Sequence, residues 1–171
     1  MNIIIFSKDR ACQLDLLIRS MKQNWPNDIK VLYTYSNSFY EKGYQKLITN
    51  NPDVFFLKER EFKSDLLGLI DSKDKWTVFL VDDIIFKNTF TFNNKLADDV
   101  VCLSLRLHPN LTYCYAANIS MKPTGKTEWY WKGLPGDYGY PMSLDGHIFR
   151  TNDIYPLLKT LPYKNPNSLE S

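Results

Sequence analysis

The sequence predicts an α/β fold, in which a mostly parallel β-sheet is flanked by helices. Over the first two thirds of the chain, apolar runs of strand length alternate with segments of helical periodicity. Repeated strand–helix–strand units of this kind form parallel sheets covered by helices. The 171 residues contain neither a linker nor an internal repeat, so we expect a single domain spanning 1–171.

Five strands and three helices are expected along the chain. The strands are apolar runs at residues 3–6, 31–35, 54–57, 76–81 and 100–105. The first helix covers residues 11–23, because Leu14, Leu17, Ile18 and Met21 share one face. A capping box of Ser38 and Glu41 starts the second helix, and the third covers residues 62–70. From Pro109 onward the chain is rich in glycine, proline and aromatic residues, which predicts an irregular second half.

Composition and charge exclude several classes of protein. Lys plus Arg is 21 against 19 for Asp plus Glu, so nothing favours a nucleic-acid partner or an anionic membrane surface. The three cysteines, Cys12, Cys102 and Cys114, lack metal-ligand spacing and suit a reducing compartment. No apolar run approaches the ~20 residues of a membrane span. The chain begins with a strand pattern and not a signal peptide, so we expect a cytoplasmic protein.

The acidic pair Asp82-Asp83 follows the buried fourth strand directly. Adjacent carboxylates repel each other unless a cation neutralises them, and their hard oxygens suit Mg²⁺ or Mn²⁺. The alternative is a turn with two solvated aspartates. Ligands bind beyond the carboxyl ends of parallel strands, so the loops at residues 7–10, 36–37, 58–61 and 82–83 should line one edge. No glycine precedes Gly43, which excludes a glycine-rich phosphate loop after the first strand.

In the order of its motifs, the chain resembles a GT-A-fold glycosyltransferase. The motifs are the strand and loop at residues 3–10, Val81-Asp82-Asp83, the aromatic stretch to Tyr140, and the segment 144–150 before an expected short helix. The resemblance implies a Rossmann-like, GT-A-like fold, with a nucleotide-sugar-binding half at 1–105 and an acceptor-side half at 106–171. It implies a nucleotide-sugar donor and a glycan or other hydroxyl acceptor.

The same resemblance implies roles for individual residues. Asp83 would hold Mn²⁺ or Mg²⁺ at the donor diphosphate, with Asp82 as a supporting contact through water or ribose. Val81 stands where the family has an acidic residue, which leaves the usual ribose contact without a counterpart. Ser7, Asp9 and Arg10 would form the nucleotide-facing loop. His147 would complete the metal site; its alternative is a structural histidine.

An inverting transfer needs a carboxylate that deprotonates the acceptor hydroxyl. Asp145, before Gly146, is the first candidate and Asp137 the second, and either could instead be a turn aspartate. The rings at residues 129–140 could stack on sugar faces or belong to the core.

Two other activities fit the same sequence: a non-catalytic module that binds a nucleotide or glycan, and a nucleotide-sugar hydrolase. The chain is short for this fold, and no closing helix is expected at residues 165–171. Both features favour a truncated or minimal form that lacks acceptor-side elements.

Overall fold

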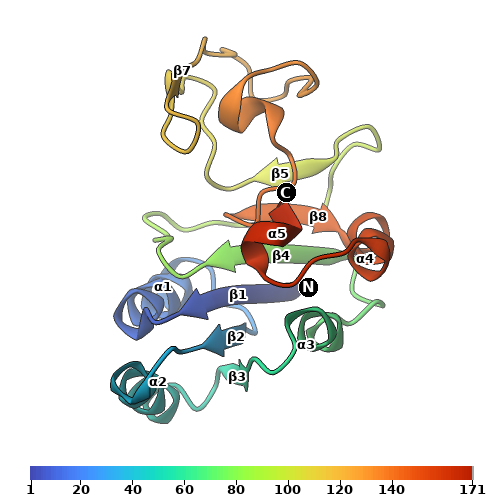
Figure 1. Cartoon of the computed structure of the whole chain (residues 1–171). Helices are drawn as coiled ribbons and strands as arrows, with labels where there is room; N and C mark the ends of the chain where they lie inside the picture. Colours follow the sequence, from blue (N-terminus) through green and yellow to red (C-terminus); the bar gives the residue numbers. More distant parts are fainter. Residues whose placement is uncertain (171) are drawn as a thin grey trace.

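A six-stranded sheet organises the computed structural model, which describes residues 1–170. The strands are β1 (Asn2–Lys8), β2 (Lys30–Thr34), β3 (Phe55–Lys58), β4 (Trp76–Val81), β5 (Cys102–Ser104) and β8 (His147–Arg150). Their order across the sheet is β3-β2-β1-β4-β8-β5 (Figure 1). The pairs from β3 to β4 are parallel, whereas β8 runs antiparallel to both β4 and β5.

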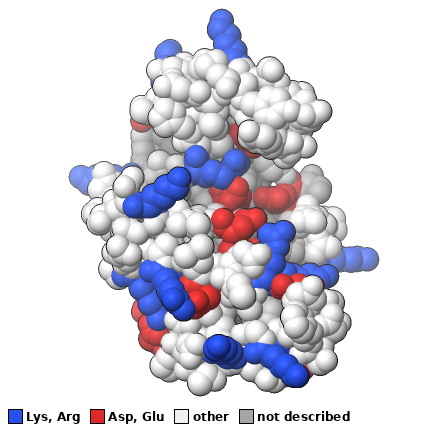
Figure 2. Space-filling model, turned by 90° about the vertical axis from the view of Figure 1, so that its left-hand side faces the viewer, with Lys and Arg blue, Asp and Glu red and all other residues white. Residues whose placement is uncertain are grey.

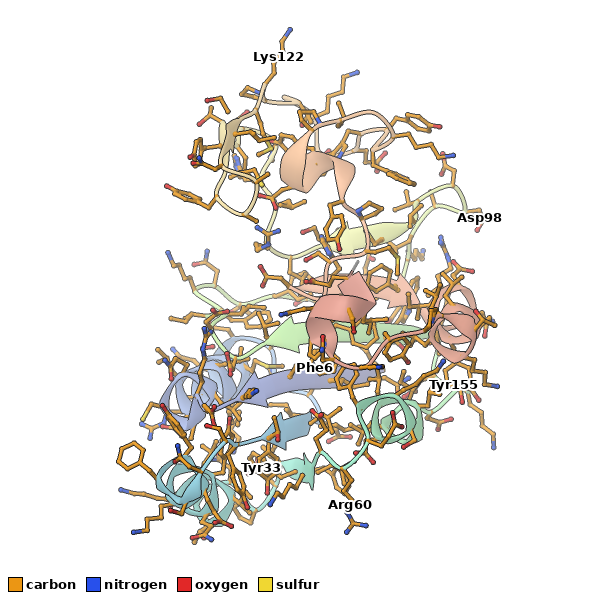
Figure 3. All side chains as sticks on the ribbon, viewed as in Figure 1. Phe6, Tyr33, Arg60, Asp98, Lys122 and Tyr155 are labelled. Atoms are coloured by element: carbon orange, nitrogen blue, oxygen red, sulfur yellow. The ribbon has the colours of Figure 1, made fainter. Side chains whose placement is uncertain are left out.

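Helices cover both faces of this sheet, which makes three layers. On one face, α1 (Ala11–Asn24) and α2 (Ser38–Asn50) pack on the alternate strand residues Ile3, Ile5, Val31, Val78 and Leu80. On the other face, α3 (Phe62–Leu69), α4 (Thr151–Thr160) and α5 (Pro166–Glu170) pack on Ile4, Phe6, Leu32, Phe79 and Phe149. Tyr33 and Phe6, labelled in Figure 3, belong to these two opposite faces. Strands apolar at every position are expected where both faces are buried.

The prediction of an α/β fold with a mostly parallel sheet flanked by helices is confirmed, with three corrections. The strand β8 was not predicted, because four residues after a glycine carry too short an apolar pattern to identify. A short helix, α5, does form at Pro166–Glu170, where no closing helix was expected. The N-cap of α2 is Asn37 and not Ser38: its side chain accepts hydrogen bonds from the backbone N–H groups of Phe39 and Tyr40.

An irregular segment, residues 84–101, covers part of the sheet where a helix would be usual. Its phenylalanine rings pack on buried tryptophans: Phe90 meets Trp25 edge-on at 5.2 Å, and Phe92 meets Trp76 at 5.1 Å. The guanidinium of Arg150 donates to three backbone carbonyls of this segment, those of Leu96, Ala97 and Val100. These contacts hold residues 84–101, between β4 and β5, in place although this segment forms no helix or strand.

A small outer lobe lies beyond β5, at the top of Figure 1. It holds the hairpin of β6 (Tyr113–Cys114) and β7 (Ile119–Ser120) and the 3₁₀-helix η1 (Gly136–Gly139). Its own core consists of Cys114, Met121 and Tyr138. Gly139 is required there, because a Cβ atom at this position would lie 2.0 Å from the Leu134 carbonyl oxygen. None of the helices among residues 1–170 is long and apolar enough to span a bilayer.

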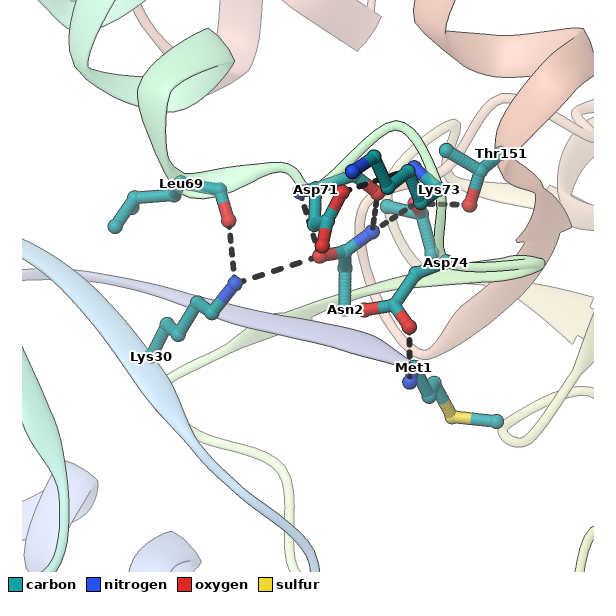
Figure 4. Close-up of polar contacts among 9 residues, drawn as sticks. Met1, Asn2, Lys30, Leu69, Asp71, Lys73, Asp74 and Thr151 are labelled. Carbon is teal, nitrogen blue, oxygen red and sulfur yellow. Dashed lines mark hydrogen bonds and ion pairs between the residues drawn. The ribbon is translucent and has the colours of Figure 1, made fainter.

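Polar contacts anchor the start of β1 at the opposite end of the sheet from the strand carboxyl ends (Figure 4). The fully buried Asn2 donates to the Asp71 carbonyl at 2.9 Å and accepts from the Asp71 N–H at 2.9 Å. Lys30 Nζ donates to the Leu69 carbonyl at 2.7 Å, and the N-terminal ammonium lies 3.1 Å from Asp74 Oδ1. These bonds tie the central strand to the turn between α3 and β4.

We expect Asn2→Ala to lower the free energy of unfolding by about 1–3 kcal/mol. The substitution removes two hydrogen bonds between the fully buried Asn2 side chain and the backbone of Asp71, and a hydrogen bond of this kind contributes about 0.5–1.5 kcal/mol. Urea denaturation measures the change. The exposed Asn152 of α4 provides the matched control, and Asn152→Ala should stay within about 0.5 kcal/mol of the natural chain. Equal stabilities for the two variants would contradict the anchoring role of Asn2.

Candidate functional site

A cleft of about 520 Å³ opens at the carboxyl ends of the parallel strands. It is lined by residues 7–10 at the end of β1, Thr34 at the end of β2, Glu59 after β3, the Asp82-Asp83 pair after β4, and residues 165–167. The prediction of one shared edge is therefore confirmed for the loops at residues 7–10, 58–61 and 82–83, whereas residues 36–37 do not line the cleft and Ser36 instead bonds to Asp9. Figure 2 looks onto this face and shows acidic side chains gathered near its middle, with basic side chains on either side.

Asp82 is buried at the inner wall of the cleft, with 4% of its surface exposed. Its Oδ2 accepts a hydrogen bond from Ser7 Oγ at 2.8 Å, and Ser7 Oγ lies 2.7 Å from the hydroxyl of the buried Tyr44. Burial raises the pKa of the Asp82 carboxyl, an effect that these bonds and the charge of Arg10 partly oppose. Ser7 therefore orients Asp82 from within the protein.

Arg10 supplies the positive charge that faces the acidic pair. Its Nη1 lies 2.9 Å from Asp83 Oδ2 and 3.4 Å from Asp82 Oδ1. The negative charge of Asp82 is the main reason that the pKa of the Arg10 guanidinium is raised. The Asp83 side chain is 58% exposed, so it is the member of the pair that a ligand in the cleft can reach. Arg10 thus lies beside the acidic pair, and its predicted contact with a nucleotide stays a prediction.

Asp9 orders the nucleotide-facing loop through its own side chain. Its backbone has φ of 60°, a left-handed conformation that few residues other than glycine adopt. The two carboxylate oxygens accept from the backbone N–H of Ser36 at 2.7 Å and from Ser36 Oγ at 2.9 Å. Asp9 thus joins the loops after β1 and β2, and its predicted contact with a nucleotide stays a prediction.

Glu59 is a cleft residue that sequence reasoning did not single out. It follows β3 and lies at the side of the cleft away from β4. Burial raises the pKa of its carboxyl, the negative charge of Asp65 adds to the rise, and the charge of Lys8 opposes it. The sequence signal that could have identified Glu59 is its position directly after a strand, because each of the other parallel strands also ends in a cleft residue.

Asp145 reaches the end of β4 because β8 is paired with that strand. The register joins Phe79 to His147, and the Gly146 N–H donates to the Phe79 carbonyl at 3.0 Å. Gly146 has φ of 78°, which favours glycine at this bend. Burial is the largest cause of the raised pKa of Asp145, and the nearby charge of Asp83 contributes in the same direction. Asp145, the predicted base, therefore lies close enough to Asp83, the predicted metal ligand, for the charge of Asp83 to affect its pKa.

Arg106 links the two candidate bases and was missed by sequence reasoning. Its Nε lies 2.7 Å from Asp145 Oδ2, and its Nη2 lies 3.1 Å from Asp137 Oδ1. The charge of Arg106 lowers the pKa of Asp145, in opposition to burial. One guanidinium thus holds the carboxylate of the sheet and the carboxylate of η1 together. A lone arginine beyond a short strand carries no sequence signal of this role.

His147 lies in a different cavity from the acidic pair. It lines a second cavity of about 1010 Å³ together with the aromatic segment 129–131, Asp137 and Tyr140. Its Nδ1 lies 2.9 Å from the Ser143 carbonyl oxygen, and burial lowers the pKa of the imidazole to about 4. The rings at residues 129–140, for which sugar stacking and a core position were both open, line this second cavity and not the cleft that holds Asp83. No group of three or more His, Cys, Asp or Glu side chains in residues 1–170 is arranged to hold a metal ion.

The buried imidazole should make stability depend on pH. Because the pKa of His147 is about 4 in the folded chain and about 6.5 when unfolded, the unfolded state binds more protons between these values. The free energy of unfolding should therefore fall by roughly 3 kcal/mol as pH drops from 6.5 to 4. Urea denaturation at several pH values measures it. This loss should disappear in His147→Gln and persist in His108→Gln, which removes the exposed histidine.

Comparison with known proteins gives one informative similarity. The chain is 32% identical, over 89% of its length, to a bifunctional glycosyltransferase, pgtA, of Dictyostelium discoideum. The match spans 24% of that protein, so the chain corresponds to about a quarter of its relative. No family model matches the chain. The similarity thus connects this fold and cleft with part of a protein named for sugar transfer.

Proposed function

We propose that this chain is a GT-A-like domain that transfers a sugar from a nucleotide-diphosphate donor to an acceptor hydroxyl, with inversion. The observation that carries the proposal is the meeting of Asp83, Arg10 and the Asp145–Arg106 pair around the end of β4. It provides a cationic and acidic site for a diphosphate beside a partly buried carboxylate. The similarity to a protein named a glycosyltransferase supports the same activity.

The strand order gives the donor a direction in the cleft. Glu59 follows β3 and Asp83 follows β4, three strand spacings away, or about 14 Å along the sheet edge. We place the diphosphate at Arg10 and Asp83, where the charges lie. The nucleobase of the donor then lies toward Glu59, where Leu32 and Phe62 provide apolar surface. The Glu59 carboxylate can accept a hydrogen bond from a ring N–H group of the nucleobase.

The acidic pair fits a divalent cation held mainly by the substrate. Mg²⁺ and Mn²⁺ commonly use one or two carboxylates and complete their ligands with phosphate and water. Asp83 would be the ligand and Asp82 its support. Asp82 and Asp83 share Arg10, and Asp137 and Asp145 share Arg106, so four carboxylate charges face two guanidinium charges and the group carries a net charge of −2 when all four are ionised. When bound, the cation would neutralise negative charge on the leaving diphosphate.

Asp145 is the proposed base. Its carboxylate takes the proton of the acceptor hydroxyl while that oxygen attacks the anomeric carbon of the donor sugar. The bond from that carbon to the diphosphate oxygen breaks, and the nucleoside diphosphate leaves beside the guanidinium of Arg10. A single displacement inverts the anomeric centre. A raised pKa suits this role, because a base is most effective when its pKa lies nearer the working pH.

Asp83→Asn should abolish Mn²⁺-dependent binding of nucleoside diphosphates and leave the fold intact. The substitution removes the exposed anionic oxygen on which the cation depends. Calorimetry with UDP and GDP, with and without Mn²⁺, measures binding. Asp53→Asn removes an exposed aspartate that pairs with Lys22 outside the cleft, and should bind as the natural chain does. Unchanged Mn²⁺-dependent affinity in Asp83→Asn would remove Asp83 from the metal site.

Asp145→Asn should reduce sugar transfer by roughly 10²–10⁴-fold, the usual contribution of a general base. In the natural chain, transfer should fall as pH drops through the raised pKa of Asp145, because the base must be ionised. Arg106→Gln should move this acid limb to higher pH, since the guanidinium lowers that pKa. Rates of nucleoside diphosphate release across pH measure both effects.

Asp137→Asn is the matched control, because it removes the other carboxylate held by Arg106. It should retain most of the transfer activity. A fully active Asp145→Asn with an inactive Asp137→Asn would assign the base to Asp137. Nucleoside diphosphate release that no acceptor accelerates would instead identify a nucleotide-sugar hydrolase.

A further inference from the structure

The second cavity, defined by its lining residues between β5 and the outer lobe, is larger than the cleft at the strand ends. Its volume is about 1010 Å³, at the upper limit of about 300–1,000 Å³ that is usual for ligand sites. One wall is β5 and the end of the segment 84–101, and the other is the aromatic segment 127–132 with Tyr138 and Tyr140. Asp98, labelled in Figure 3, lies on the loop that precedes β5.

A buried polar group faces this cavity. His147 is 1% exposed, and its Nδ1 is engaged by the Ser143 carbonyl at 2.9 Å. Because a carbonyl can only accept, Nδ1 carries the proton and Nε2 presents a lone pair. Within the described chain Nε2 has no hydrogen-bond partner, and His147 contributes to the cavity wall. Such a group is expected to receive a hydrogen bond from a bound ligand or water.

The rest of the wall indicates the chemical class of that ligand. Trp129, Tyr130, Trp131 and Tyr140 present aromatic surface, and Trp129 is held in place by a 3.0 Å bond from its Nε1 to the Tyr138 carbonyl. The charged residues of the wall are two lysines, Lys95 and Lys132, and three acids, Asp99, Glu128 and Asp137. This balance does not favour a phosphate-bearing ligand. Aromatic faces with hydrogen-bond acceptors suit a neutral molecule that has C–H faces and hydroxyl groups.

We infer that this second cavity binds a saccharide, with the His147 Nε2 accepting a hydrogen bond from a sugar hydroxyl and the aromatic segment covering a sugar face. The inference rests on the proposed function, for which the saccharide is the acceptor. Asp137 lines the cavity and shares Arg106 with Asp145, so the cavity and the proposed base are connected by two ion pairs. Arg106 therefore links a saccharide held beside Asp137 to the proposed base, which itself lines neither cavity.

Histidine NMR on the full chain tests the inference. The sequence has two histidines, so selective labelling gives one ring signal from the cavity and one from His108, which does not line it. The probes are methyl glucoside, galactoside and mannoside, as α and β anomers, up to tens of millimolar. We expect at least one probe to shift the His147 signal and leave the His108 signal in place. No shift with any probe would overturn the inference.

Matched variants separate this site from the rest of the surface. Tyr130→Ala and Trp131→Ala remove cavity rings and should weaken the binding of the active probe by tenfold or more. Tyr115→Ala removes a ring that is 89% exposed on the β6–β7 hairpin and lies outside the cavity, and should bind as the natural chain does. Equal binding in all three variants would show that the probe binds elsewhere and overturn the inference.

Asp83→Asn distinguishes failure of the saccharide site from failure of the proposed transfer. Its acidic pair lies in the other cleft, so glycoside binding should persist in this variant even where nucleotide binding is lost. A His147 shift produced by UDP and Mn²⁺ but by no glycoside would assign the cavity to the donor. That result would overturn the saccharide site and leave nucleotide binding itself established.

Discussion

The antiparallel insertion of β8 between β4 and β5 is the constraint on which the site depends. Without it the sheet would end at β4, and the Asp82-Asp83 pair would stand at an open edge. The bond from the Gly146 N–H to the Phe79 carbonyl, at 3.0 Å, and that from the Leu105 N–H to the Gly146 carbonyl, at 2.7 Å, fix the bend on both sides. Asp145 and Arg106 lie next to these bonded residues, so their positions are set by backbone pairing and do not depend on a flexible loop.

The charges around this bend are arranged at a cost to the fold. Burial raises the pKa values of Asp82 and Asp145, which means that the protein environment disfavours their ionised forms. Arg10 and Arg106 offset part of that cost through ion pairs at 2.9 and 2.7 Å. A fold that only needed stability would place amides or apolar side chains here. Retaining carboxylates that a cation or substrate could stabilise is typical of a binding site.

The sequence predicts the parallel part of this protein well and the antiparallel part poorly. The strands β1, β2 and β4 are buried on both faces and the edge strand β3 is partly exposed, but each leaves an apolar run, and the carboxyl ends of these strands identify Asp82, Asp83 and Arg10. The short β8 leaves no such run, and its pairing is a long-range property of the chain. Arg106 was missed for the same reason, because its importance comes from the two carboxylates that the fold brings beside it. Glu59 differs, since it lies in the loop 58–61 that was expected at this edge, and its place directly after a strand could have singled it out.

The shared guanidinium of Arg106 has a consequence for how the two cavities act together. It holds Asp145 of the β4 end and Asp137 of the outer lobe at the same time, at 2.7 and 3.1 Å. A ligand that draws Asp137 toward itself leaves Arg106 to interact with Asp145 alone, which favours the ionised carboxylate. A ligand that draws Arg106 away has the opposite effect and raises the pKa of Asp145. A ligand in the second cavity that contacts Asp137 or Arg106 would therefore change the pKa of Asp145, the proposed base, through the Arg106 side chain.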